Sequence, residues 1–183
     1  MKRFPIASGL FIFFVGVGIS GCWKNEGECP EARFVSNRDY YPAFHRLALR
    51  ADDRILAVIY LAKFHREGET EVNMILEDLI LAKERGLSVR ILLEKSYWDS
   101  SLNSYNQEFI DSLESHGIIA SFDDLNVTTH AKCVVFDGEV ALFGSTNWTT
   151  SALERNNEVN IELHDETICG EIEEYINTLW EGK

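Results

Sequence analysis

Short apolar runs alternate with amphipathic segments along most of the chain, and this alternation predicts an α/β protein. Each apolar run has the length of a buried strand. The predicted strands cover residues 55–61, 89–93, 118–120, 133–136, 140–143 and 159–163. Apolar side chains at helical spacing predict helices at 39–50, from Thr70 to Gly86, around 109–113 before Gly117, and from Asp165 onward.

Capping residues define the ends of these helices. Thr70 and Asp165 are suitable N-caps, and Gly86 and Gly117 are suitable ends. The strand–helix–strand unit from 55 to 93 predicts parallel pairing with a right-handed crossover. The polar segment 97–105 is expected to be a loop. In the last helix the spacing predicts that these residues face inward: Ile168, Ile172, Tyr175, Ile176 and Leu179.

The dipeptide Asp137-Gly138 separates two predicted strands and favours a tight hairpin. We therefore expect one domain, built as a mixed β-sheet flanked by helices on both faces, with its functional residues at strand ends. Because side chains at positions i and i+2 of a strand share a face, His130 and Lys132 are expected to project side by side.

The N-terminal segment predicts targeting to the cell envelope. Lys2 and Arg3 precede an apolar stretch that is short for a membrane span, and the stretch ends in Ile19-Ser20-Gly21-Cys22. This ending resembles the lipobox of bacterial lipoproteins, in which the cysteine is lipidated. Residues 1–22 are thus a lipoprotein-type signal or an uncleaved signal anchor, residues 23–37 a linker, and residues 38–183 the domain. Both alternatives place the domain outside the cytosol, anchored to a membrane.

The chain of 183 residues carries a net charge of −13, from 17 basic and 30 acidic side chains. A protein that holds nucleic acid on a broad basic surface is therefore not expected, although a small basic cleft in an acidic surface stays possible. With Cys22 lipidated, an odd number of cysteines remains, which predicts no complete disulfide framework. The cysteine spacing predicts no metal site.

Candidate chemistry is concentrated between residues 130 and 158. A neutral His130 imidazole can act as a nucleophile toward phosphorus, and the Lys132 ammonium can stabilise charge on the non-bridging oxygens. Asn147 can donate hydrogen bonds to the same oxygens, with Ser145 in support. A carboxylate at Glu158 could hold the histidine ring in the useful tautomer.

The order His130-Ala131-Lys132, then Asp137, then Gly144-Ser145-Thr146-Asn147 resembles the HxKxxxxD and GSxN motifs of the phospholipase D superfamily. The resemblance covers roughly residues 54–163. It is closest to single-motif members, which include small bacterial endonucleases and mitochondrial cardiolipin hydrolase-like proteins.

The resemblance implies a role for each motif residue. His130 would form a covalent phosphohistidine, while Lys132 and Asn147 bind the phosphate. Ser145 would assist them, and Glu158 would orient the histidine. Asp137, counted with the catalytic residues, would have a structural or protonation-tuning role. No metal or cofactor is required by this mechanism.

In-line displacement needs an acid opposite the nucleophile, and the chain has one HxK motif. We therefore expect a two-fold homodimer in which His130 of each chain faces a shared cleft. Another histidine could be the acid instead, although none of the following sits in a matching motif: His45, His65, His116 and His164.

The expected substrate is nucleic acid, with phospholipid hydrolysis or transphosphatidylation as the alternative. A membrane-tethered binding module with a dead site is an alternative of another class. Trp98 and Trp148 are either a substrate-contacting rim or packing residues.

Overall fold

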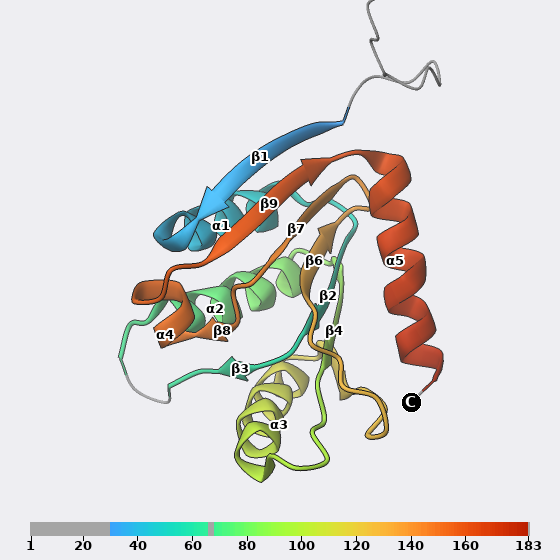
Figure 1. Cartoon of the computed structure of the whole chain (residues 1–183). Helices are drawn as coiled ribbons and strands as arrows, with labels where there is room; N and C mark the ends of the chain where they lie inside the picture. The colour runs from blue at the N-terminus through green and yellow to red at the C-terminus, as the bar shows by residue number, and fades with distance from the viewer. Residues whose placement is uncertain (1–29, 66–67, 183) are drawn as a thin grey trace, which may run out of the picture.

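A computed structural model describes residues 30–65 and 68–182 and shows a seven-stranded sheet (Figure 1). The strand order is β1-β9-β7-β6-β2-β4-β5. β2, β4 and β5 pair in parallel, and the other neighbours pair antiparallel. The strands are β1 (Glu31–Ser36), β2 (Arg54–Ile59), β4 (Ser88–Leu93), β5 (Ile119–Phe122), β6 (Lys132–Phe136), β7 (Val140–Gly144) and β9 (Val159–His164).

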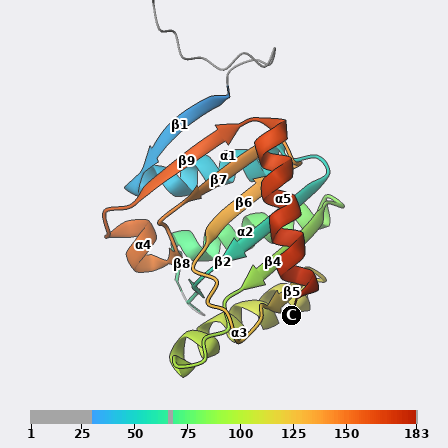
Figure 2. The same ribbon diagram turned by 45° about the vertical axis from the view of Figure 1, so that its right-hand side comes forward.

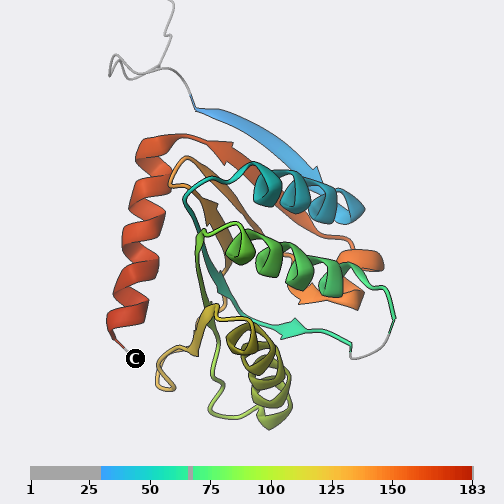
Figure 3. The same ribbon diagram turned by 180° about the vertical axis from the view of Figure 1, so that it is seen from behind.

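Helices cover both faces of the sheet, so the predicted fold class is confirmed. α1 (Tyr40–Arg50), α2 (Glu71–Glu84) and α3 (Ser100–Ser115) lie on one face (Figure 3), and α5 (Glu166–Glu181) crosses the other (Figure 2). Each face has its own apolar core, the larger one under the three helices. The remaining elements are a 3₁₀ turn (Asn37–Asp39), β3 (Ala62–Lys63), β8 (Trp148–Thr149) and α4 (Thr150–Glu154); β3 and β8 pair in parallel.

The local signals behave as expected. Thr70 Oγ1 accepts a hydrogen bond from Asn73 N, and Asp165 Oδ1 accepts one from Ile168 N, so both predicted N-caps are confirmed. Asp137 and Gly138 have φ values of 56° and 75°, the left-handed region that a tight β-hairpin turn requires. β2 and β4 pair in parallel as predicted.

The linker predicted at 23–37 is wrong in its last part, because residues 31–36 form β1. This strand pairs with β9 along its whole length, and Val35 is its single buried residue. It is an edge strand held by backbone pairing, so it needs no apolar run that sequence inspection would detect. The domain therefore begins at β1 rather than at residue 38.

The loop predicted at 97–105 is also wrong, because α3 begins at Ser100. Asp99 caps it, its Oδ1 accepting from the backbone N–H groups of Ser101 and Leu102 at 3.0 Å. Asn106 is buried although the surrounding sequence is polar. Its side chain accepts a hydrogen bond from Ala62 N and donates to the carbonyl oxygens of Tyr60 and Glu94. A polar residue in this role carries no apolar signal.

Two of the residues that were predicted to face inward on α5 are exposed. Cys169 and Ile176 are buried, whereas Ile168 is 37% and Tyr175 59% exposed. A single helix lying across a sheet buries a narrow stripe, and both exposed residues lie at its edges. None of the helices in the described ranges is long and apolar enough to span a membrane. Cys22 and the predicted signal lie outside the described residues.

Candidate active site

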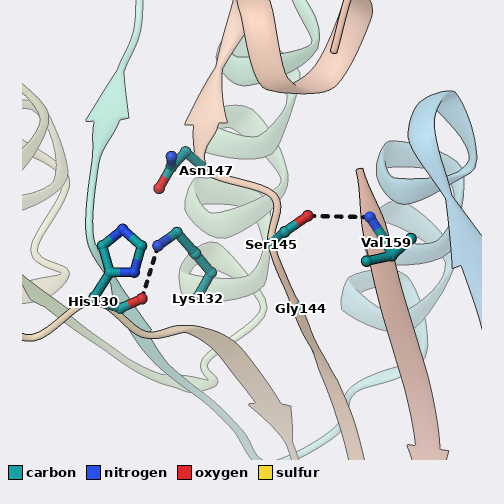
Figure 4. A pocket seen from close by; sticks show the side chains of 6 residues that line it. All are labelled: His130, Lys132, Gly144, Ser145, Asn147 and Val159. Carbon is teal, nitrogen blue, oxygen red and sulfur yellow. Dashed lines mark hydrogen bonds between the residues drawn. The ribbon is translucent and has the colours of Figure 1, made fainter. Parts of the chain in front are cut away.

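A pocket of about 450 Å³ opens at the end of the sheet where β6 begins, β7 ends and β9 begins. Its lining residues are His130, Lys132, Gly144, Ser145, Asn147 and Val159. The structure thus brings together four of the predicted site residues. Figure 4 shows the side chains of His130, Lys132 and Asn147 turned toward one another, with Ser145 turned toward β9.

His130 lies just before β6, and its ring is exposed to the pocket. The Tyr60 ring stands edge-on to it, with centroids 4.5 Å apart. Burial and then the charge of Lys132 lower the pKa of His130. A lowered pKa favours the neutral imidazole, which is the form that can attack phosphorus.

Lys132 is the first residue of β6 and is 7% exposed. Its Nζ donates to the His130 carbonyl oxygen at 2.7 Å and lies 4.8 Å from the centre of the Tyr60 ring. Burial lowers its pKa, while nearby Glu158 raises it. Tyr60 therefore packs against both reactive side chains. Sequence reasoning missed this role because Tyr60 ends an apolar strand run.

Ser145 lines the pocket, but its hydroxyl is engaged elsewhere. Oγ donates to the Glu158 carboxylate and accepts from Val159 N at 3.1 Å. Glu158 also accepts from Asn156 Nδ2 at 3.0 Å. The hydroxyl therefore braces the loop after β7 against β9.

The predicted contact between Glu158 and His130 is not formed within one chain. In the part of the chain that the structure describes, no hydrogen bond joins the Glu158 carboxylate to the His130 ring. The Glu158 carboxylate instead accepts a hydrogen bond from Ser145, and its negative charge raises the pKa of Lys132.

Asn147 presents an unused hydrogen-bonding atom. Its Oδ1 is buried and has no partner among the described residues. A buried polar atom without a partner costs roughly 1–3 kcal/mol. Turning the carboxamide over places its NH₂ group at the same position, where it can donate to an anion.

Gly144 is required by close strand packing. A Cβ at this position would overlap the Val159 carbonyl oxygen and the Cα of Asn160. The glycine therefore lets β7 and β9 approach where the pocket forms, and it sets the path of the loop to Asn147.

Asp137, which was grouped with the catalytic residues, lies outside the pocket. It lies in the β6–β7 turn, roughly 16 Å from Lys132 along the strand. Its carboxylate accepts from the backbone N–H groups of Asp52, Asp53 and Arg54 at 2.9–3.0 Å. These hydrogen bonds fasten the hairpin to the segment that starts β2.

Trp148 is a core residue and not a rim residue. It is 0% exposed, lies 5.8 Å from the rings of Phe44 and Phe109, and donates from Nε1 to Tyr40 Oη at 3.1 Å. Trp98, in contrast, is 71% exposed on the loop after β4. This loop lies at the pocket end of the sheet, because Leu93 and Lys132 are both partners of Ile59.

Among the residues that the structure describes, His130 is the one histidine that lines the pocket. His45 pairs with Asp78, His164 with Glu162, and His116 with the Ser112 carbonyl. Across residues 30–65 and 68–182, no three His, Cys, Asp or Glu side chains are grouped so that they could hold a metal ion.

Residues 47–180 match the family model described as cardiolipin synthase, PLD-like domain. Mitochondrial cardiolipin hydrolase of Xenopus tropicalis is 30% identical over 103 residues, which is 56% of this chain and 47% of that protein. The human protein is 32% identical over 102 residues, 55% of this chain and 38% of that protein. The chain thus spans about half or less of the length of these curated relatives.

Solved structures share the fold across most of the chain. The phospholipase D family member Nuc from Salmonella typhimurium superposes with a TM-score of 0.69 at 19% identity, covering 84% of this chain and 95% of that one. NucT from Helicobacter pylori gives a TM-score of 0.67 at 18% identity, covering 84% and 97%. At these identities the likeness concerns the fold.

Proposed function

Since the chain belongs to the PLD-like domain family, within the phospholipase D superfamily, we propose that it hydrolyses phosphodiesters through a covalent phosphohistidine. The observation that supports this is the convergence of His130, Lys132 and Asn147 on one pocket. A neutral imidazole, a buried ammonium and an unpartnered carboxamide together fit a tetrahedral anion.

The reaction has two steps. A ring nitrogen of His130 attacks phosphorus, the bond to the leaving oxygen breaks, and an acid gives that oxygen a proton. Water then attacks the phosphohistidine and gives a proton to the group that acted as the acid, which releases a phosphomonoester and restores both the imidazole and the acid. Lys132 and Asn147 hold the non-bridging oxygens throughout, while Ser145 braces the loop that carries Asn147.

The acid comes from a second copy of the chain in a two-fold homodimer. Within residues 30–65 and 68–182, His130 is the one histidine lining the pocket, and it cannot attack and protonate from opposite sides at once. In a two-fold dimer each chain supplies the same residue to a shared cleft.

Subunit mixing tests this assembly. Wild-type and His130→Ala chains are co-refolded in equal amounts, and activity should fall to about one quarter, as the square of the wild-type fraction. A fall to one half would mean that each chain holds a complete site.

Nucleic acid is the first candidate substrate. Tyr97 and Trp98 are 80% and 71% exposed on the loop after β4, at the pocket end of the sheet, where they offer surfaces for base stacking. Phospholipid is the second candidate. It is favoured by the relatives named mitochondrial cardiolipin hydrolase.

The deciding experiment incubates the domain separately with single-stranded DNA, duplex DNA, RNA and cardiolipin vesicles. His130→Ala should lower turnover by roughly three orders of magnitude or more on the true substrate. The exposed His116, whose ring bonds the Ser112 carbonyl, provides the matched control His116→Ala, which should keep full activity. Acid-labile phosphate on wild-type protein after a quenched reaction identifies the intermediate. If the His130→Ala variant kept most of the wild-type turnover, His130 would not be the nucleophile and the proposal would be refuted.

A further inference from the structure

Two acidic side chains meet behind the segment that leads to His130. Glu94 directly follows β4 and Asp123 directly follows β5, and they are 1% and 6% exposed. They are neighbours because these strands pair in parallel with Leu93 opposite Phe122. The backbone reinforces the contact, since Asp123 N donates to the Leu93 carbonyl oxygen at 2.9 Å.

Each carboxyl holds one backbone amide. Glu94 Oε2 accepts from Thr129 N at 2.6 Å, and Asp123 Oδ1 accepts from Lys95 N at 2.7 Å. Oδ2 of Asp123 is buried and accepts from no fixed donor in the described part of the chain. Two neighbouring groups can donate a hydrogen bond to Asp123: the Glu94 carboxyl, when it is protonated, and the Thr129 hydroxyl.

Burial and then the charge of Asp123 raise the pKa of Glu94 to about 7, although the Thr129 amide opposes this. Burial likewise raises the pKa of Asp123. The other ionisable groups close by are Tyr60, whose pKa rises through burial and the Glu94 charge, and Lys95, whose ammonium lies over the Phe122 ring. Two contacting buried carboxylates repel each other, and one shared proton removes that repulsion.

The Glu94 contact fixes the backbone on one side of His130, because Thr129 is the preceding residue. On the other side, the Ala131 carbonyl oxygen accepts from Tyr60 N at 2.9 Å. The buried Asn106 joins the two anchors, since its Nδ2 donates to the carbonyl oxygens of Tyr60 and Glu94, each at 2.9 Å.

From this geometry we propose that Glu94 is a positioning residue for His130 and acts as a protonated acid hydrogen-bonded to Asp123. The inference rests on the proposed nucleophilic role of His130. The His130 ring has no hydrogen bond of its own among the described residues, so its place in the pocket follows from its backbone and from Tyr60. In-line attack needs a near-attack geometry, and a displacement of about 1 Å can cost roughly a hundredfold in rate.

Two substitutions distinguish the positioning role of Glu94 from a role in packing alone. Glu94→Gln reproduces the protonated acid, because its carbonyl can accept from Thr129 N while its NH₂ donates to Asp123. It should keep kcat within about twofold of wild type. Glu94→Ala should lower kcat by roughly tenfold to a hundredfold with little change in KM, since Lys132 and Asn147 still bind phosphate. Rates are taken per folded molecule, with the folded fraction measured by circular dichroism.

Amide hydrogen exchange at Thr129 and His130 provides a readout that does not depend on activity. Exchange should be faster in Glu94→Ala and unchanged in Glu94→Gln. Wild-type exchange or wild-type kcat in the Ala variant overturns the proposal. A Gln variant as impaired as the Ala variant overturns the protonated form. If wild-type protein cleaves no phosphodiester, the proposed function fails, while the exchange rates still decide whether Glu94 fastens this segment.

Discussion

Removing the Asp137 carboxylate should destabilise the fold and spare the chemistry. Three backbone N–H groups, of Asp52, Asp53 and Arg54, donate to this carboxylate at 2.9–3.0 Å. Hydrogen bonds to a charged group contribute about 1.5–3 kcal/mol each and are not additive, so we expect a total loss of roughly 2–4 kcal/mol.

The conformation of Asp137 adds a second cost that can be measured separately. Its φ of 56° lies in the left-handed region, where alanine is disfavoured by about 1–2 kcal/mol and glycine is not. Asp137→Ala should therefore unfold more easily than Asp137→Gly by about that amount. A loss of about 3 kcal/mol should lower Tm by roughly 6–12 °C in a domain of this size.

Urea unfolding and turnover per folded molecule test this assignment together. Both variants should keep most of the wild-type kcat, because Asp137 lies at the other end of β6 from the pocket. Wild-type stability combined with lost turnover would refute the structural role and return Asp137 to the catalytic residues.

The contribution of Asp137 to stability should decrease as the pH falls. Burial raises the pKa of Asp137, but the backbone donors and then Arg54 outweigh burial, so the folded-state pKa is lowered. Such a group stabilises the fold above its unfolded pKa of about 3.9, and this contribution is lost as pH falls through the folded value. The stability difference between wild type and Asp137→Asn should therefore be full near neutral pH and shrink in acid.

Further outcomes follow from the site and the core. Trp148→Ala should cost roughly 3–5 kcal/mol in chemical unfolding, whereas Trp98→Ala should change stability by less than about 0.5 kcal/mol; equal losses would contradict their different burial. Turnover should persist in excess EDTA, because Lys132 and Asn147 offer charge and donors to phosphate; loss on chelation with recovery on adding one divalent ion would contradict this. Cys22→Ser should release the protein from membranes in fractionation, while a variant that stays bound and unprocessed would favour an uncleaved anchor.

Features with a local cause were predictable from the sequence. The strand runs follow from apolar stretches, the Thr70 and Asp165 caps from their hydroxyl and carboxylate, and the hairpin from Asp137-Gly138. The grouping of His130 and Lys132 follows from strand alternation. Asn147 could be placed beside them because a hairpin returns the chain to the same end of the sheet.

Features that depend on distant partners were not predictable. β1 exists because β9 presents an open edge, and no property of its own residues indicates this. The roles of Tyr60 and Glu94 depend on the segment 129–131, which is remote in sequence. Trp148 and Trp98 look alike in sequence, and only packing against Phe44 and Phe109 separates the buried one from the exposed one.

β1 begins at the end of the sheet opposite the pocket and runs toward the pocket. Glu31 pairs with His164, far from the pocket, whereas Ser36 pairs with Val159, which lines it. The chain therefore joins the sheet about 20 Å from the pocket end. The end of the sheet where β1 begins also carries the Asp137 turn, because Val140 and Glu31 both pair with His164. The N-terminal end of β1 and the pocket therefore lie at opposite ends of the sheet, so a group attached ahead of β1 would meet the domain on the side away from the pocket.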